Sequence, residues 1–188
     1  MPHFDFRPAV MGTRFYRYGR GMSGDNHITK IEFDSSDDVF ELGFELTLGG
    51  LSYLKYPDDY MDIIGKDSFN HQGYQPFYVN FIFFIQEGMK VNTLINHHSI
   101  YVSEEMLKED SVNIMYTVTK FRKDLEQEFG YSSDFTQSMY HLNVIISDEE
   151  IKLDKNNDSE ISDFIFNNYN TIFKTKIPYI AERNTKNE

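Results

Sequence analysis

The alternation of apolar and polar residues between Val39 and Leu48 constrains the fold of this chain more than any other feature. Successive side chains of an extended segment point to opposite faces, so this alternation produces one apolar face and one polar face. The apolar face carries Phe40, Leu42, Phe44, Leu46 and Leu48, and the polar face carries Glu41, Gly43, Glu45 and Thr47. We therefore predict a half-buried strand over residues 39–48. Gly49 and Gly50 are expected to form a two-residue turn with positive φ, and residues 51–56 to return as the partner strand.

Further segments with strand character predict that this hairpin belongs to a mainly antiparallel sheet. Residues 77–85 (FYVNFIFFI) are apolar on both sides, which is typical of a central strand covered on two faces. A short turn leads into a strand over residues 89–95, and residues 139–146 form a later strand. The segments 13–18 and 28–33 are expected to add shorter strands.

Two later stretches repeat their apolar residues every three or four positions, which predicts helices. The first helix is expected over residues 104–129, behind Ser103 as its N-cap, with Ile114, Val118, Phe121, Leu125 and Phe129 on one face. The second is expected over residues 159–173, with Ile161, Phe164, Ile165, Asn168 and Ile172 facing inward. The polar residues 174–188 are expected to fray.

Strands in the first half and helices in the second indicate an α+β fold rather than alternating α/β units. We predict a single domain over residues 1–188, with a mainly antiparallel sheet of about five to seven strands and two amphipathic helices packed on it. A chain of 188 residues is long enough to bury a core without covalent staples. The 17 Phe and 13 Tyr predict an interior rich in aromatic rings.

The absence of cysteine excludes disulfides, thiolate zinc sites and cysteine nucleophiles. It fits a reducing compartment, and we expect a cytoplasmic protein. Arg and Gly interrupt the first 21 residues where a signal peptide needs an unbroken apolar segment. The longest apolar run, residues 81–85, is far too short to span a membrane.

Motifs for a metal, a cofactor or catalysis are incomplete in this sequence. Asp154, Asn156, Asp158 and Glu160 have the spacing that opens an EF-hand loop, but Ser159 and Ile165 stand where that loop needs Gly and Glu. A solvated loop before a capped helix explains these residues as well. The adjacent His97 and His98 should point to opposite faces of an extended segment. We therefore assign no catalytic residue, no metal ligand and no cofactor.

The charge of the chain indicates what kind of partner it attracts. The formal net charge is −12, and the basic, aromatic segment 1–24 holds four arginines against one acidic residue, so that the rest carries −15. Such a charge repels nucleic acids and anionic membranes and attracts basic proteins. We expect the arginines of segment 1–24 to pair with the protein's own carboxylates.

The preferred functional hypothesis is a binding protein that neutralises a basic effector: an immunity protein, an antitoxin or an inhibitor, with a nuclease toxin or another nucleic-acid enzyme as the effector. The residues expected to bind this partner are the carboxylates of one loop and strand and two aromatic anchors: Asp34, Asp37, Asp38, Glu41, Glu45, Tyr53 and Tyr56.

Two other functions stay open at this stage. The first is an enzyme whose site is assembled from dispersed residues around His71, His97, His98 and His141, although the lack of a motif favours a non-enzymatic role. The second is a structural or accessory subunit of a phage or mobile element, which would form a homo-oligomer through exposed Tyr and Phe side chains.

Overall fold

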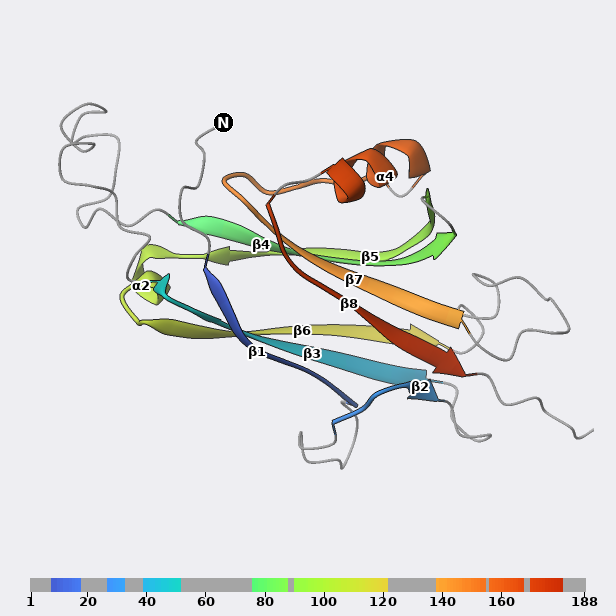
Figure 1. The fold of residues 1–188 in the computed structure, drawn as a ribbon, viewed down its shortest axis with the longest axis horizontal. Helices are drawn as coiled ribbons and strands as arrows, with labels where there is room; N and C mark the ends of the chain where they lie inside the picture. Colours follow the sequence, from blue (N-terminus) through green and yellow to red (C-terminus); the bar gives the residue numbers. More distant parts are fainter. Residues whose placement is uncertain are drawn as a thin grey trace, which may run out of the picture.

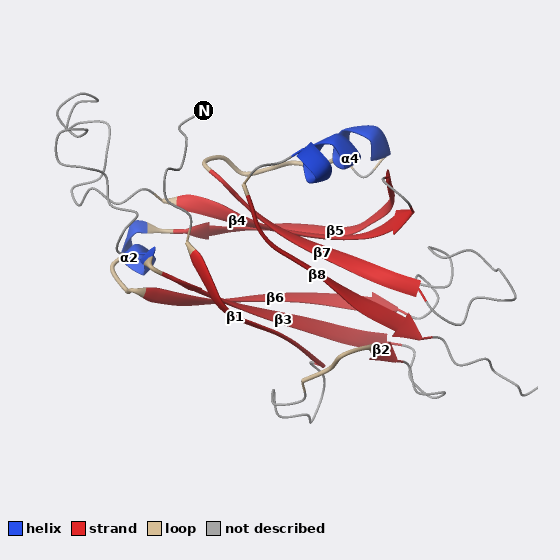
Figure 2. Ribbon diagram, viewed as in Figure 1, coloured by secondary structure: helices blue, strands red, loops and turns tan. Residues whose placement is uncertain are grey.

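The computed structural model of the chain describes residues 8–17, 27–32, 39–51, 76–87, 90–121, 138–154, 156–167 and 170–180. These residues form two β-sheets that pack face to face, with a helix on the outer side of one of them (Figures 1 and 2). The elements are β1 (Ala9–Arg17), β2 (Ile31–Glu32), β3 (Val39–Gly49), β4 (Phe77–Glu87), β5 (Lys90–Val102), α2 (Glu104–Leu107), β6 (Ser111–Phe121), β7 (Ser138–Ser147), α4 (Asp158–Asn167) and β8 (Thr171–Ile180).

The strands form a three-stranded sheet of order β1-β3-β6 and a five-stranded sheet of order β2-β8-β7-β4-β5. The two-residue strand β2 lies parallel to β8, and the other neighbours are antiparallel. The expectation of mainly antiparallel structure is therefore confirmed, but the strands divide between two sheets instead of forming one. The organisation of residues 1–188 as a single domain stays a prediction.

The core between the two sheets consists largely of aromatic rings. Phe44 of β3 meets Phe81 of β4 edge to face, with 6.1 Å between ring centroids, and Phe81 stacks on Tyr116 of β6 at 5.1 Å. Phe173 of β8 stacks on Phe44 at 5.9 Å. These contacts join the three-stranded sheet to the five-stranded one, and each ring pair adds a directional attraction to the burial of apolar area.

Strand β4 is buried on both faces, as its apolar sequence predicted. Phe81 and Phe83 point into the core between the sheets, whereas Ile82 and Phe84 pack on the opposite face. There they form a second apolar cluster with Ile161 and Ile165 of α4, among others. Helix α4 therefore covers part of the outer face of the five-stranded sheet. The side chains of this face that lie beside the helix stay accessible.

The prediction of a long helix over residues 104–129 is wrong. Helix α2 ends at Leu107, and residues 111–121 form β6, which pairs with β3 along the full length of both strands. Positions i and i+4 share a face in a strand as well as in a helix, so the spacing of Ile114 and Val118 fits both structures. The rest of the prediction, residues 122–129, lies outside the described residues.

The C-terminal prediction also needs correction. Helix α4 confirms the expected helix as far as Asn167, but Ile172 belongs to β8. Residues 174–180, which were expected to fray, continue this strand, and residues 174–179 pair with β7. Residues 181–188 lie outside the described part of the chain.

The turn after β3 agrees only in part with its prediction. Gly50 has a φ of 70°, as a turn glycine should, but Gly49 is still a strand residue and pairs with both Ala9 and Ser111. Strand β3 thus has β1 on one side and β6 on the other. Of the strand expected to return over residues 51–56, Leu51 is described and is not part of a strand, and residues 52–56 lie outside the described residues.

The strands expected over residues 13–18, 77–85, 89–95 and 139–146 are confirmed as far as the structure describes these residues, and β5 continues to Val102. Of the strand expected over residues 28–33, only β2 (Ile31–Glu32) forms within the described residues. Within the described residues no helix is both long enough and apolar enough to cross a membrane.

Candidate functional site

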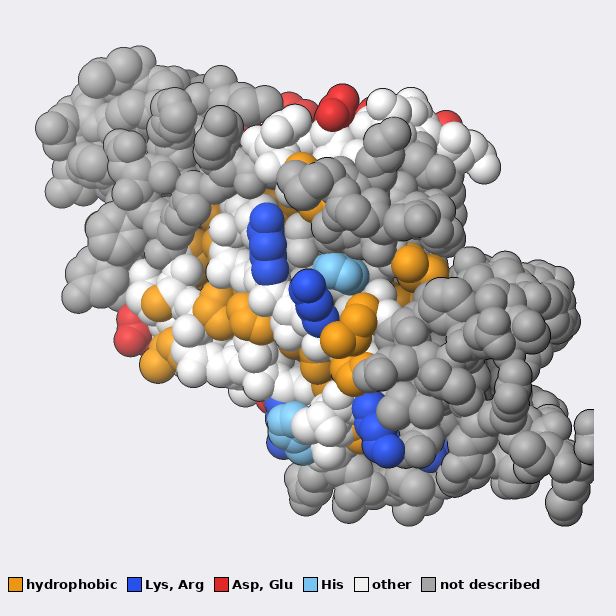
Figure 3. All heavy atoms as spheres, turned by 45° about the vertical axis from the view of Figure 1, so that its right-hand side comes forward, with side chains coloured by type: hydrophobic (Ala, Val, Ile, Leu, Met, Phe, Trp, Pro, Cys, Tyr) orange, Lys and Arg blue, Asp and Glu red, His pale blue; other side chains and the backbone are white. Residues whose placement is uncertain are grey.

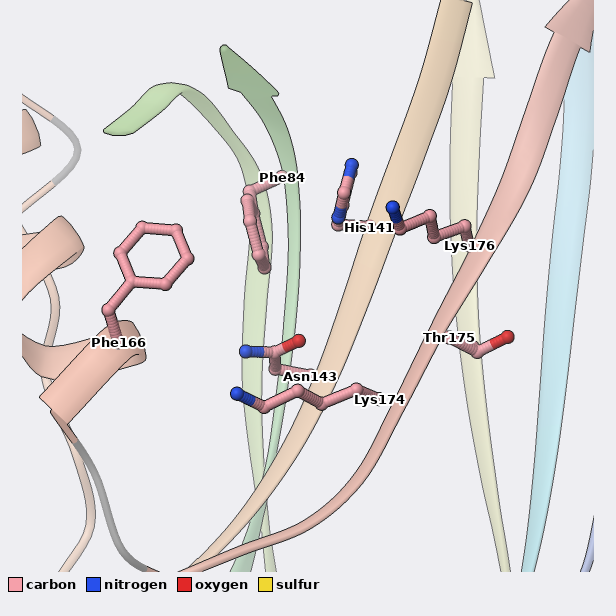
Figure 4. Close-up of a pocket in the computed structure, with 7 residues that line it drawn as sticks. All are labelled: Phe84, His141, Asn143, Phe166, Lys174, Thr175 and Lys176. Carbon is pink, nitrogen blue, oxygen red and sulfur yellow. The ribbon is translucent and has the colours of Figure 1, made fainter. Parts of the chain in front are cut away.

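A hollow of about 260 Å³ lies on the outer face of the five-stranded sheet, beside α4. Its lining residues come from β4, β7, β8 and α4, and they are Phe84, His141, Asn143, Phe166, Lys174, Thr175 and Lys176. Figure 4 shows the His141, Asn143, Lys174 and Lys176 side chains on one side of β7 and β8, with Phe166 facing them from α4, whereas Thr175 points to the other side of β8. We call this hollow the β7–β8 pocket.

The register of β7 and β8 brings the polar side chains of this pocket together. His141 pairs with Lys176, and Asn143 pairs with Lys174. Because residues i and i+2 of a strand share a face, the four side chains form a block two residues long and two strands wide. The block lies next to α4, whose last turn supplies Phe166.

The electrostatics of the β7–β8 pocket differ from those of the chain as a whole. Both lysines are exposed, and neither has an acidic partner among the residues that the structure describes. Figure 3 shows basic and histidine side chains together near the middle of this face, while the acidic side chains of the described residues lie at its margin. Burial lowers the pKa of His141, and the charge of Lys176 lowers it further.

A chain of polar side chains crosses the same sheet farther along β4. Asn80 is fully buried, and its Nδ2 donates to the Ile145 carbonyl at 3.1 Å and to Ser147 Oγ at 2.8 Å. Ser99 Oγ donates to Asn80 Oδ1 at 2.6 Å and lies 3.4 Å from His97 Nε2. Ser147 Oγ donates in turn to the Glu149 carbonyl. The amide nitrogen and the amide oxygen of the Asn80 side chain therefore both have hydrogen-bond partners, as buried polar groups usually do.

The histidines named in the enzyme hypothesis do not converge. His97 lies opposite Ile82 and His98 opposite Phe81 in the β4–β5 ladder, so the two imidazoles point to opposite faces of the sheet, as expected. His98 packs toward Tyr116, with 6.3 Å between ring centroids, and His141 stacks on Phe84 at 5.4 Å. His71 lies outside the described residues. Among the described side chains, no group of three or more His, Cys, Asp or Glu could hold a metal ion.

The pKa values of His97 and His141 predict how stability depends on pH. Burial lowers the pKa of His97, the charge of His98 lowers it further, and Glu150 opposes the shift. In the unfolded chain both imidazoles take up a proton near pH 6.5. Below that pH the unfolded state therefore binds more protons than the folded state, and the free energy of unfolding should decrease as the pH falls.

Urea unfolding between about pH 7.5 and about pH 5.5, where most carboxylates stay ionised, measures this effect. The His97→Gln/His141→Gln variant should show a flatter decrease than the unmodified protein, and each single variant an intermediate one. Equal slopes in all four proteins would contradict the prediction.

The loop before α4 caps the helix. Asn157 Oδ1 accepts a hydrogen bond from the Glu160 amide, and Asn157 Nδ2 donates to Glu160 Oε2. The Asn156 amide donates to Asp154 Oδ1 at 3.0 Å. Asn157 is thus the N-cap residue, and its side chain satisfies the amide of the third helical residue, Glu160, which has no partner inside the helix. The structure therefore supports the interpretation of this segment as a solvated loop and a cap.

Of the residues predicted to bind a partner, the structure describes the side chains of Glu41 and Glu45. Both are half-buried on the outward face of the three-stranded sheet. Glu45 lies between Arg14 of β1 and Met115 of β6, and Arg14 Nε donates to Glu45 Oε2. The expected pairing of N-terminal arginines with the protein's own carboxylates is thus confirmed for Arg14. The other predicted residues, Asp34, Asp37, Asp38, Tyr53 and Tyr56, lie outside the described residues.

Apart from His141, the residues of the β7–β8 pocket were not predicted from the sequence. The sequence does contain a strand pattern at this pocket, because residues 173–177 (FKTKI) alternate between apolar or small residues and lysine. The polar composition of residues 174–188 predicts a frayed tail instead. Asn80 gave a weaker signal as the one polar residue within the apolar run 77–85.

Comparison of this chain with protein-family models, with curated proteins and with solved structures found no match.

Proposed function

We propose that this chain is a cytoplasmic binding protein that neutralises a basic protein effector, as an immunity protein, an antitoxin or an inhibitor does. The observation that carries the proposal is the outward face of the three-stranded sheet, where Glu45 lies opposite the exposed Met115, Glu41 lies nearer the start of β3, and the exposed Met11 lies against Gly49 at its end. Met11 is 68% exposed and Met115 is 57% exposed.

This face combines two properties of a protein-binding surface. Methionine side chains are flexible and polarisable, so they adapt to the shape of a partner. The carboxylates supply attraction for a basic partner, and the net charge of −12 steers that partner from a distance. A nuclease toxin fits this description because its cleft must be basic to hold nucleic-acid phosphates.

The ion pair between Arg14 and Glu45 sharpens the proposal. In the free protein, Arg14 forms an ion pair with the Glu45 carboxylate. The guanidinium of Arg14 therefore competes with any cation of a partner for this carboxylate. A basic partner has to displace this guanidinium or share the carboxylate with it. Removal of Arg14 should therefore strengthen binding, whereas removal of Glu45 should weaken it.

The experiment is affinity purification from the native host, followed by calorimetry with the purified basic protein that is recovered. Glu41→Gln/Glu45→Gln should weaken binding about tenfold, and Arg14→Gln should strengthen it about threefold. The matched control is Glu104→Gln/Glu105→Gln, which removes the same charge from α2 and should change affinity less than about threefold. Affinity should also fall between about 0.05 M and about 0.5 M salt.

Other results would refute the proposal. Equal losses of affinity in the two double variants would show that binding depends on net charge alone and not on the outward face of the three-stranded sheet. Recovery of no protein partner, together with a tightly bound metal or nucleotide in the mass spectrum, would favour an enzyme. A concentration-independent ring or dimer in light scattering would favour a structural or accessory subunit.

A further inference from the structure

The β7–β8 pocket gathers positive charge on an acidic protein. Lys174 and Lys176 are two residues apart on one face of β8, so their Cβ atoms lie roughly 7 Å apart. Both side chains extend over this face of the sheet (Figure 4), and no described carboxylate pairs with either. An anion within reach of both would pair with this positive charge.

Asn143 provides a second, independent sign of a ligand. Its side chain is only 4% exposed, it lines the pocket, and it makes no hydrogen bond with any residue that the structure describes. Its amide atoms are not among the fully buried polar atoms without a partner, so the amide opens onto the pocket, where it can donate a hydrogen bond to a bound group. Figure 4 shows this amide beside the Lys174 side chain and directed toward α4.

The walls of the pocket are apolar and aromatic. His141 stacks on Phe84 with an angle of 28° between the rings, and the half-buried Phe166 of α4 faces them. Burial and Lys176 lower the pKa of His141, so this imidazole contributes a neutral ring rather than a third cation near neutral pH. A volume of about 260 Å³ leaves room for one small ring system.

We propose that the β7–β8 pocket binds a small anion that carries a flat ring, with its phosphate or carboxylate held by Lys174 and Lys176 and its ring against the aromatic side chains that line the pocket, Phe84, His141 and Phe166. The Asn143 amide donates to the anionic group. A nucleoside monophosphate has this chemistry. The site lies on the five-stranded sheet and is separate from the outward face of the three-stranded sheet, so its occupation does not depend on the function proposed above.

Isothermal calorimetry with adenosine monophosphate tests the site. We expect one molecule bound per chain with a Kd on the order of 0.1 mM, because the site is small and open. Inorganic phosphate and adenosine, which each carry half of the proposed chemistry, should bind at least tenfold more weakly. Absence of binding at about 5 mM adenosine monophosphate, with benzoate at the same concentration also inactive, would overturn the proposal.

Variants separate this site from general electrostatic attraction. Lys174→Gln and Lys176→Gln should each weaken binding of adenosine monophosphate about fivefold, and Phe166→Ala should weaken it to a similar degree. The matched control is Lys108→Gln, an exposed lysine at the end of α2, which should leave the affinity unchanged. Circular dichroism establishes that each variant is folded. An equal loss in Lys108→Gln, or none in the pocket variants, would contradict the assignment.

Discussion

Replacement of Gly43 by valine should destabilise the protein by about 3 kcal/mol. Gly43 lies in the middle of β3, opposite Tyr16 of β1, and a Cβ atom at Gly43 would collide with the Tyr16 ring. Tyr16 is buried, with 2% of its surface exposed, so its ring cannot move aside without loss of packing. Local propensity alone predicts the opposite sign, because valine favours strands and glycine weakens them.

Two other glycines serve as controls for this prediction. A Cβ at Gly12 meets Thr47 only at 3.8 Å or more, so Gly12→Val should change the free energy of unfolding by less than about 0.5 kcal/mol. A Cβ at Gly49 would collide with Met11, but this side chain is flexible and exposed, so Gly49→Ala should cost less than about 1 kcal/mol. Urea unfolding measures all three. A Gly43→Val protein as stable as the unmodified one would show that Tyr16 repacks without cost.

Replacement of Asn80 by leucine should destabilise the protein by about 3 kcal/mol, although leucine suits the apolar run in which Asn80 lies. The substitution removes the acceptor of the Ser99 hydroxyl and the donor to both Ser147 and the Ile145 carbonyl. Ile145 is fully buried, so water does not replace the donor that its carbonyl loses, and the half-buried Ser99 and Ser147 lose a buried partner as well.

The matched control for Asn80 is Asn113→Leu on β6. The side chain of Asn113 is exposed and accepts one hydrogen bond from Thr47 Oγ1 at 2.6 Å. Its partner can turn to water, so the cost should stay below about 1 kcal/mol. Thermal unfolding of both variants measures whether the loss of stability depends on the burial of the asparagine or only on the loss of its hydrogen bonds. Similar losses at the two positions would contradict the role assigned to the buried network.

The candidate sites show where local patterns stop being informative. The opposite orientation of His97 and His98 follows from strand geometry and was predicted. The sequence did not predict that the pocket residues His141, Asn143, Lys174 and Lys176 lie close together. Their proximity depends on the register between β7 and β8, which are separated by a loop and a helix. Register is determined by the packing of whole strands, and a single residue of slip would move each lysine to the other face.

The sequence by itself determined the features that depend on the period of its apolar residues over a few positions. Residues 39–48 form a strand with one buried face, residues 77–85 form a strand buried on both faces, and residues 159–167 form a helix, because each pattern fits one local geometry. The tertiary structure decided the remainder. Ile114 and Val118 fit a helix or a strand equally well, and their pairing with β3 selected the strand because it buries them against the second sheet. The division of the strands between two sheets has the same cause, since apolar faces on strands far apart in sequence need each other for burial.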